Sequence, residues 1–201
     1  MLNIKELLVG MPVRLRYVNR FSTCRVNKFE TVAEHSYYVA FYALMISEWC
    51  VQNKISHDRK IILERALLHD LEEAATGDFP RGFKYSDDSL RKHMNEVALK
   101  GLKSVVIALW NDENVIKNIM DFWQNAKDDS IEGKILELAD FFSVLSYVYE
   151  EIRSSNFTMR EHVDSLQEYY QKFTTKEFDF LRSLIEQART ILFLEILDAS
   201  I

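Results

Sequence analysis

The sequence predicts an all-α fold, and three observations support this. Glycine and proline are scarce, with 5 and 2 among 201 residues, which favours long helices over a turn-rich β architecture. Apolar residues recur at helical spacing along most of the chain, and no segment alternates as a strand does. No internal repeat or low-complexity tract appears. We therefore expect about six to eight helices in one helical domain over residues 1–201.

Composition limits the classes of function. Hydrophobic residues make up 48% and charged residues 28% of the chain, as in a globular protein that is large enough to bury a full core. The net charge of −6 argues against binding to a nucleic-acid polymer, because a phosphate backbone requires clustered lysine and arginine. A small anionic substrate needs only one or two local cations and remains allowed.

The two cysteines, Cys24 and Cys50, form neither a disulfide framework nor a Cys-x-x-Cys metal site. Their number suits a reducing compartment. The first eight residues are amphipathic and lack the features of a signal peptide, and no apolar run is long enough to span a membrane. We therefore expect a cytoplasmic protein with no membrane contact.

The first elements are predicted in order along the chain. A short helix over residues 2–9 ends before Gly10, and residues 15–30 form an irregular segment rich in arginine. Thr31 and Glu34 match a capping box that starts a helix reaching about residue 53. Another helix starts at residues 56–59 and leads to His69, and residues 78–85 form a loop.

Helices are then expected over the remaining chain, at residues 87–110, 114–126, 131–154, 160–173 and 175–198. The helices within 160–199 pack on the domain or form a dimer contact, because the last of them carries more apolar surface than one side of a small bundle needs. His93 and His162 lie on charged helix faces, and we expect both to be exposed to solvent. The aromatic residues of 141–149 are expected in the core.

The stretch from Ala66 to Pro80 is the richest in chemistry. An apolar helical run ends in His69-Asp70, a carboxylate follows one turn later at Glu73, and a Gly-Asp-x-Pro turn closes the segment. A single histidine at a helix end is more often a core or capping residue than a ligand. Complementary ligands occur elsewhere, however, at His35 and at Asp140. Asp140 has apolar neighbours on both sides, and buried carboxylates are rare unless they are paired or bind a metal.

These segments supply two imidazoles and two carboxylates, from His35, His69, Asp70 and Asp140. Such a set can hold one divalent ion, and the ligand types alone do not choose among Co, Mn, Zn, Ni, Fe and Mg. With four protein ligands and no thiolate, an octahedral ion keeps positions for water and substrate. An open position is typical of a catalytic rather than a structural site.

Six motifs in order strengthen this interpretation. They are Arg20-Phe21, Val32 to Ser36, Leu68 to Glu73, Thr76 to Pro80, Lys84-Tyr85 and Leu138 to Asp140. Together they resemble the HD-domain metal-dependent phosphohydrolases, and in particular the bacterial 5′-deoxynucleotidase (YfbR-like) branch. The resemblance covers about residues 15–155. Phe21 departs from it, because that branch typically has tryptophan after the arginine, and the change bears on sugar or base selectivity.

The resemblance implies an all-α HD-domain bundle and a role for each matching position. His35, His69, Asp70 and Asp140 hold the metal, and Asp70 with Glu73 forms the catalytic group. Glu73 orients the attacking water or protonates the leaving oxygen. The substrate contacts are implied to be Arg20 on the phosphate, Asp78 on a sugar hydroxyl, and Phe21 and Lys84 nearby.

The expected function is hydrolysis of the 5′-phosphate from deoxyribonucleoside monophosphates, with a small-molecule nucleotide as the partner. One alternative is a phosphohydrolase that acts on nucleoside di- or triphosphates at the same metal site. Another is a helical binding protein without catalysis, although that predicts degraded ligands and all four are present. The family resemblance also implies a homodimer.

Overall fold

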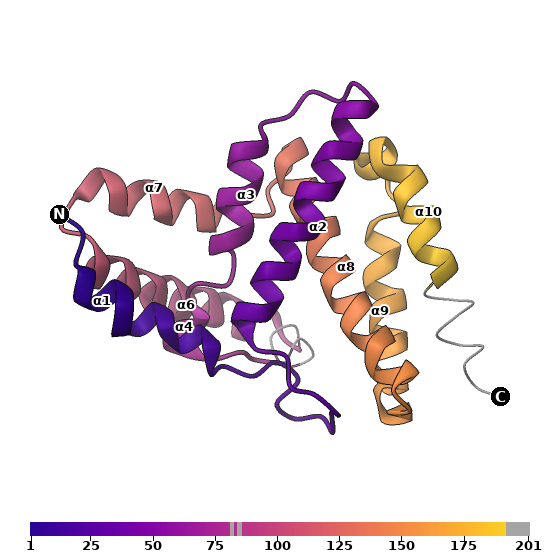
Figure 1. Cartoon of the computed structure of the whole chain (residues 1–201), viewed down its shortest axis with the longest axis horizontal. Helices are drawn as coiled ribbons and strands as arrows, with labels where there is room; N and C mark the ends of the chain where they lie inside the picture. Colours follow the sequence, from indigo (N-terminus) through magenta and orange to yellow (C-terminus); the bar gives the residue numbers. More distant parts are fainter. Residues whose placement is uncertain (81–82, 84–85, 192–201) are drawn as a thin grey trace.

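The computed structural model describes residues 1–80, 83 and 86–191, and it confirms the all-α prediction. Figure 1 shows helices running through the molecule, with the N-terminus at one end and the C-terminal helices at the other. Within the described ranges there is no strand. Only isolated bridges occur, which join Leu2 to Trp110 and Asn19 to Thr31.

The chain begins with α1 (Ile4–Val9), which is capped by the Asn3 side chain and ends at Gly10. A 3-10 helix, η1 (Met11–Arg16), follows directly and takes Pro12 in its first turn, where no intrahelical donor is needed. The predicted N-terminal helix is therefore present, although its first turn starts two residues later than expected.

Two long helices, α2 (Val32–Gln52) and α8 (Ile131–Arg153), pack side by side through the middle of the molecule (Figure 1). The capping box predicted for α2 is confirmed. The Thr31 hydroxyl accepts from the Glu34 amide, and the Glu34 carboxylate accepts from the Thr31 amide at 2.8 Å. This closed start fixes the first turn of α2, and His35 is one of its buried residues.

The segment that carries His69 and Asp70 is not one continuous helix, because turns interrupt it. The helix α3 (Arg59–Leu68) ends one residue before His69, and α4 (Glu73–Thr76) is a single turn. Between them the chain makes tight turns, in which the Glu73 amide donates to the Asp70 carbonyl at 3.1 Å. Residues three apart eclipse one another in such turns. Asp70 and Glu73 therefore lie on the same side of the segment.

The later helices match the predicted order. They are α6 (Asp88–Leu109), α7 (Glu113–Gln124), η2 (Phe157–Arg160) and α9 (Glu161–Lys172). The predicted helix over 175–198 is instead a 3-10 helix, η3 (Lys176–Leu181), followed by α10 (Arg182–Thr190). Residues 192–198 of that prediction lie outside the described residues.

Two apolar clusters form the core. The larger joins α2, α3 and α8 to α9, η3 and α10, and Phe141, Phe173 and Phe178 are among its largest buried side chains. The smaller joins α4 to α6, with α7 packed against it. Ala66 belongs to the first cluster and Leu71 to the second. The His69-Asp70 pair therefore lies where the chain passes from one cluster to the other.

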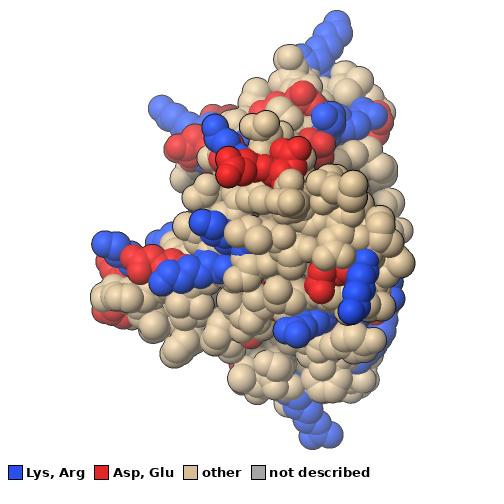
Figure 2. Space-filling model, turned by 90° about the vertical axis from the view of Figure 1, so that its left-hand side faces the viewer, with Lys and Arg blue, Asp and Glu red and all other residues tan. Residues whose placement is uncertain are grey.

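Charged side chains of both signs share the face of the molecule drawn in Figure 2. On the face drawn in Figure 2, lysine and arginine are interspersed with aspartate and glutamate instead of forming one basic stripe. Among the described residues, no helix has the length and apolar character needed to cross a membrane.

The capping box of α2 gives a prediction about stability. We expect Thr31→Ala to lower the free energy of unfolding by about 1 kcal/mol, because the Glu34 amide loses its acceptor. Urea denaturation measures this loss. The matched control is Ser104→Ala, since the exposed Ser104 donates only within its own helix. A Thr31→Ala protein as stable as the Ser104→Ala control would contradict the role of the cap.

Candidate active site

The four predicted metal ligands come together from three segments of the chain. His35 lies in the first turns of α2, His69 and Asp70 in the turn after α3, and Asp140 in α8. His35 Nε2 is 3.0 Å from Asp140 Oδ1 and 3.6 Å from Asp70 Oδ2. His69 Nε2 is 3.1 Å from Asp70 Oδ2. The side chains therefore gather around one point.

The outward nitrogens of both imidazoles suit a cation. His69 Nδ1 is 2.8 Å from the Ala66 carbonyl oxygen, which only accepts, so Nδ1 carries the proton and Nε2 holds a lone pair in the neutral ring. His35 Nδ1 lies 3.0 Å from Ser143 Oγ, which can accept the Nδ1 proton when Nε2 binds a cation. Both Nε2 atoms are buried without a hydrogen bond of normal geometry. Histidine ligands of metals are oriented through their second nitrogen in this way.

The donor set therefore fits a divalent ion. Ligand atoms of His35, His69 and Asp140 lie within 4.8 Å of one another, and Asp70 bridges the two rings. Each ring offers a neutral nitrogen and each aspartate a carboxylate oxygen.

The electrostatics of the cluster favour ionised carboxylates beside a neutral His35, whereas burial of His69 is outweighed by the charge of Asp70, which raises the pKa of His69. Burial and the Arg20 charge lower the pKa of His35 to about 4. Burial opposes ionisation of Asp140, but the charges of Lys127 and His35 outweigh it and hold its pKa well below the ordinary value. The pKa of Asp70 is likewise lowered, because its contacts with His69 outweigh its burial. Asp70 and Asp140 are thus ionised at neutral pH, beside the positive charges of Lys127 and Arg20.

Lys127 is a site residue that sequence reasoning missed. It lies in the connection between α7 and α8, and its Nζ is 2.5 Å from Asp140 Oδ2. Partial burial alone would lower its pKa, but the charges of Asp140 and Asp70 outweigh this and raise the pKa. A lysine beside Asp128 and Asp129 looks like an ordinary surface residue in sequence, so no local signal marks it.

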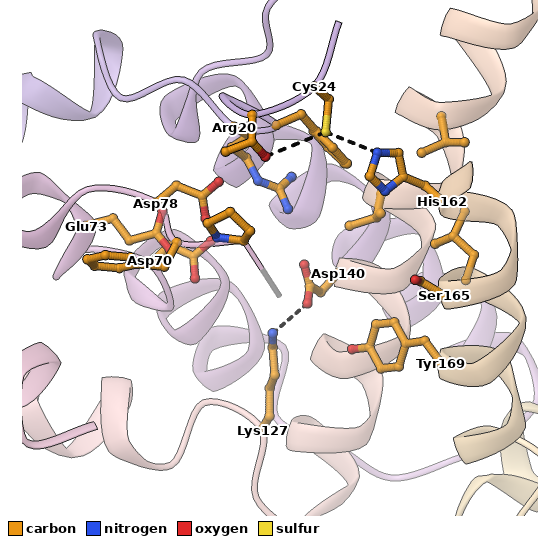
Figure 3. Close-up of a pocket in the computed structure, with 17 residues that line it drawn as sticks. Arg20, Cys24, Asp70, Glu73, Asp78, Lys127, Asp140, His162, Ser165 and Tyr169 are labelled. Atoms are coloured by element: carbon orange, nitrogen blue, oxygen red, sulfur yellow. Dashed lines mark hydrogen bonds and ion pairs between the residues drawn. The ribbon is translucent and has the colours of Figure 1, made fainter. Parts of the chain in front are cut away.

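A pocket of about 280 Å³ opens beside the cluster (Figure 3). Asp70, Glu73 and Asp140 line the wall nearest the cluster, and His162 and Tyr169 of α9 line the wall opposite. The pocket is therefore built from both sides of the fold, with charged groups on one side and α9 on the other.

Three further predicted site residues line this pocket. Glu73 is only 3% exposed. Asp78 follows Gly77, whose φ of +77° turns the chain back toward the pocket. Arg20 points its guanidinium into the space between Asp78 and Asp140 (Figure 3). These side chains surround a volume that touches the proposed metal cluster directly.

The Arg20 guanidinium is held by Glu30, since Nη1 donates to Glu30 Oε2 at 2.8 Å. Burial raises the pKa of Glu30 to about 7, although the charge of Arg20 partly opposes this. Arg20 is only 14% exposed. A buried guanidinium that is fixed on one side presents its remaining donors in a set direction, which suits a phosphate.

Phe21 also lines the pocket, in an uncommon backbone conformation. Its φ is +53°, in the left-handed region that non-glycine residues rarely adopt. Stacking of its ring on Tyr147, with centroids 4.9 Å apart, accompanies this conformation. The surrounding contacts must outweigh a strain of about 1–2 kcal/mol. Phe21 is thus held at a defined place on the pocket wall.

The loop that carries Arg20 and Phe21 is anchored to the end of α8. Glu151 accepts hydrogen bonds from the backbone amides of Asn27 and Lys28, at 2.7 and 3.0 Å. The Tyr147 hydroxyl donates to the Lys28 carbonyl at 2.8 Å. The segment predicted as irregular is therefore ordered by contacts with a distant helix.

Two further predictions concern the substrate contact of Lys84 and the exposure of His162. Lys84 lies outside the described residues, so its predicted substrate contact stays a prediction. The expectation that His162 is exposed to solvent is wrong. Its side chain is 28% exposed, and its Nε2 lies 3.1 Å from Cys24 Sγ. The spacing of His162, Leu166 and Tyr169 on one helix face could have placed it beside the core.

The anchor at Glu151 yields a prediction. We expect Glu151→Gln to cost about 1.5–3 kcal/mol of unfolding free energy at pH 7, because a buried carboxylate that accepts several hydrogen bonds is lost. Hydrogen bonds from Asn156, Asn27 and Lys28 outweigh burial and lower the pKa of Glu151 from 4.5. The carboxylate therefore stabilises the protein above its unfolded pKa, and this contribution is lost as pH falls.

Denaturation at several pH values measures this effect. The difference between wild type and Glu151→Gln should shrink as the pH drops below 4.5 and through the folded pKa. Glu150→Gln is the matched control, because Glu150 is the exposed neighbour in the same helix. A difference that stays constant down to strongly acid pH would rule out the carboxylate as its source.

The chain resembles known proteins over most of its length. The family described as 5′-deoxynucleotidase YfbR-like matches residues 8–188. A 5′-deoxynucleotidase of Photorhabdus temperata is 28% identical over 149 residues, which cover 71% of this chain and 72% of the relative. A 5′-deoxynucleotidase of Photorhabdus laumondii is 24% identical over 173 residues, which cover 83% and 84%.

Solved structures share the fold. A crystal structure of an HD-domain phosphohydrolase from Listeria innocua has a TM-score of 0.74 at 21% identity, over 96% of this chain and 88% of that one. A conserved hypothetical protein from Pyrococcus furiosus has a TM-score of 0.69 at 25% identity, over 93% and 99%. Because the family match spans nearly all the described helices, the chain belongs to the YfbR-like family of 5′-deoxynucleotidases.

Proposed function

We propose that this protein hydrolyses deoxyribonucleoside 5′-monophosphates to a deoxynucleoside and phosphate, with His35, His69, Asp70 and Asp140 as ligands of one divalent ion. The observation that carries the proposal is the gathering of two buried imidazole nitrogens and two carboxylates at the wall of a pocket. The named activity of the relatives in the family supports the substrate class.

The cluster would hold the ion through the Nε2 atoms of His35 and His69 and through carboxylate oxygens of Asp70 and Asp140. When bound, a divalent ion supplies a Lewis acid for the phosphoryl oxygen and a water of lowered pKa. The identity of the ion follows neither from the ligand types nor from the relatives. The hydrogen bond of His69 to the Ala66 carbonyl keeps its Nε2 directed at the cluster.

Glu73 is the candidate for proton transfer. It lies one tight turn after Asp70, it is buried, and it lines the pocket. It can accept the proton of the attacking water as the new P–O bond forms and return that proton to the 5′-oxygen as the P–O5′ bond breaks. Both proton transfers require a carboxylate beside the proposed ligands, and Glu73 occupies such a position.

Two cations of the pocket can bind the phosphate. Arg20 offers a planar set of donors, and Lys127 offers a point charge 2.5 Å from Asp140. Each offsets the repulsion that Asp70 and Asp140 would exert on an incoming dianion. The acidic cluster alone would repel such a substrate, and the two cations together with the proposed ion would offset this repulsion.

Asp78 is the candidate contact for the deoxyribose. Its carboxylate lines the pocket beside Arg20, and it is an acceptor for a sugar hydroxyl (Figure 3). Phe21 lies next to Arg20 on the same wall and limits the width of the pocket there. We propose that these two residues set the preference for the sugar.

We further propose that residues 1–201 form a single domain and that the protein is a homodimer, as expected from the sequence. We also propose a cytoplasmic location, because the number of cysteines suits a reducing compartment. Hydrolysis of di- or triphosphates at the same cluster is the alternative activity. A substrate panel that separates release of phosphate, pyrophosphate and triphosphate, with and without chelator, distinguishes these activities.

The role of Glu73 can be tested directly. We expect Glu73→Gln to lower kcat for a deoxyribonucleoside monophosphate by about 10²–10⁴-fold with little change in KM, because proton transfer is lost and binding is kept. Steady-state kinetics with elemental analysis measure this. The bound metal should stay at the wild-type level, whereas His69→Ala should lose one equivalent of metal together with its activity.

Glu64→Gln provides the control for both variants, since Glu64 lies on α3 and pairs with Lys60 away from the pocket. It should match the wild type in metal content and in rate. A Glu73→Gln enzyme that keeps its metal and turns over at the wild-type rate would exclude Glu73 from catalysis.

Asp78 gives a prediction about selectivity. We expect Asp78→Asn to lower kcat/KM for the deoxyribonucleotide by about tenfold or more, because a hydrogen bond to a charged group contributes about 1.5–3 kcal/mol. The ratio of kcat/KM for the deoxyribonucleotide to that for its ribonucleotide counterpart should fall. An unchanged ratio in the active variant would show that Asp78 does not read the sugar.

A further inference from the structure

A second group of metal-binding side chains lies on the pocket wall opposite the proposed catalytic cluster. Cys24 is in the anchored loop, and Glu161 and His162 begin α9. His162 Nε2 is 3.1 Å from Cys24 Sγ and 3.8 Å from Glu161 Oε1. One ligand atom from each of the three residues lies within 4.8 Å of the others. Figure 3 shows Cys24 and His162 side by side, across the pocket from Asp70 and Glu73.

These separations are close to the edges of a zinc tetrahedron. A Zn–S bond of about 2.3 Å and a Zn–N bond of about 2.05 Å at the tetrahedral angle place S and N about 3.6 Å apart. The same angle places N and a carboxylate oxygen about 3.4 Å apart. The observed 3.1 and 3.8 Å lie on either side of these values. Each of these two separations therefore differs from its ideal value by about 0.5 Å or less.

Contacts outside the group already hold two of its members in place. The Cys24 amide donates to the Phe21 carbonyl at 2.9 Å, which fixes the turn that presents the thiol. The rings of His162 and Phe21 form a T-shaped pair, with centroids 5.5 Å apart. Asn156 donates to the Arg25 carbonyl at 2.8 Å and so ties the next residue of the loop to the segment before α9. The two ligands are thus brought together by the fold across 138 residues of sequence.

We propose that Cys24, Glu161 and His162 form a second metal site, which binds Zn²⁺ or another divalent ion that prefers thiolate. Three protein ligands leave a fourth position, as in open zinc sites. Because Cys24 and His162 both line the pocket, water or a ligand within the pocket can fill that position. Binding releases the thiol proton to solvent, with no change of oxidation state. This site does not depend on the proposed nucleotidase activity.

The thiolate makes this site separable from the catalytic cluster by spectroscopy. Among the described residues, the cluster of His35, His69, Asp70 and Asp140 offers only nitrogen and oxygen ligands. Cobalt(II) bound there gives ligand-field bands alone, whereas cobalt bound to Cys24 also gives a sulfur-to-metal charge-transfer band in the near ultraviolet. The other cysteine, Cys50, is fully buried in the apolar core and serves as an internal control.

The experiment is a cobalt titration of the full, reduced and metal-stripped chain, followed by absorbance and by elemental analysis. We expect about two ions per chain and a thiolate charge-transfer band in the wild type. Cys24→Ser and His162→Gln should each bind about one ion fewer, and Cys24→Ser should lack the band. Cys50→Ala should keep both the band and the metal content of the wild type.

A fourth variant separates this proposal from the proposed function. His69→Ala should lose an ion but keep the charge-transfer band, and a failure of the catalytic assignment alone would leave the band unaffected. Circular dichroism establishes that each variant is folded. The proposal is overturned if the folded wild type shows no thiolate band at saturating cobalt, since Cys24 and His162 then form only a hydrogen-bonded pair. A band that persists in Cys24→Ser would overturn it equally.

Discussion

The site depends on a break in one helix at the boundary between two apolar clusters. Ala66 anchors the end of α3 in the larger cluster, and Leu71 anchors the next turn in the smaller one. The residues between them can neither continue the helix nor move freely, so the His69 ring is fixed against the Ala66 carbonyl. Packing energy from both clusters therefore positions a polar pair that would otherwise favour solvent. The same break uses tight turns, which bring Asp70 and Glu73 to one side.

Charge balance is the second constraint on this arrangement. The pocket places Asp70, Asp140 and Glu73 close together, and burial makes their mutual repulsion strong. Lys127 and Arg20 offset part of it, as the lowered pKa of Asp140 beside Lys127 indicates. A divalent ion at the two Nε2 atoms would offset much of the remainder. Removing one ligand should therefore change the protonation of its neighbours as well as the coordination.

Most of the fold could be predicted from the sequence because its signals are local. Capping by Thr31, the scarcity of glycine and the helical spacing of apolar residues each act within a few residues. Asp140 could be singled out as a candidate ligand because buried charge in an apolar helix is rare, and His35, His69 and Asp70 are proposed with it from their residue types. Lys127 and His162 could not, since each becomes part of the pocket only through contacts with distant segments. Helical periodicity identifies the apolar face of one helix, but it does not identify the distant segment that packs against that face.

The proposed metal ligands and the residues proposed to recognise the substrate lie in different parts of the fold. The proposed ligands lie on α2, α8 and the turn after α3, which are packed into the core, whereas Phe21 and Cys24 lie on a loop and His162 on α9. That loop is tied to α8 through Glu151 and the Tyr147 hydroxyl, so it is ordered without belonging to the core. Substitutions there can alter the pocket wall without disturbing the ligand cluster. Phe21 lies on this loop, so its identity shapes the pocket wall without altering the residues of the proposed ligand cluster.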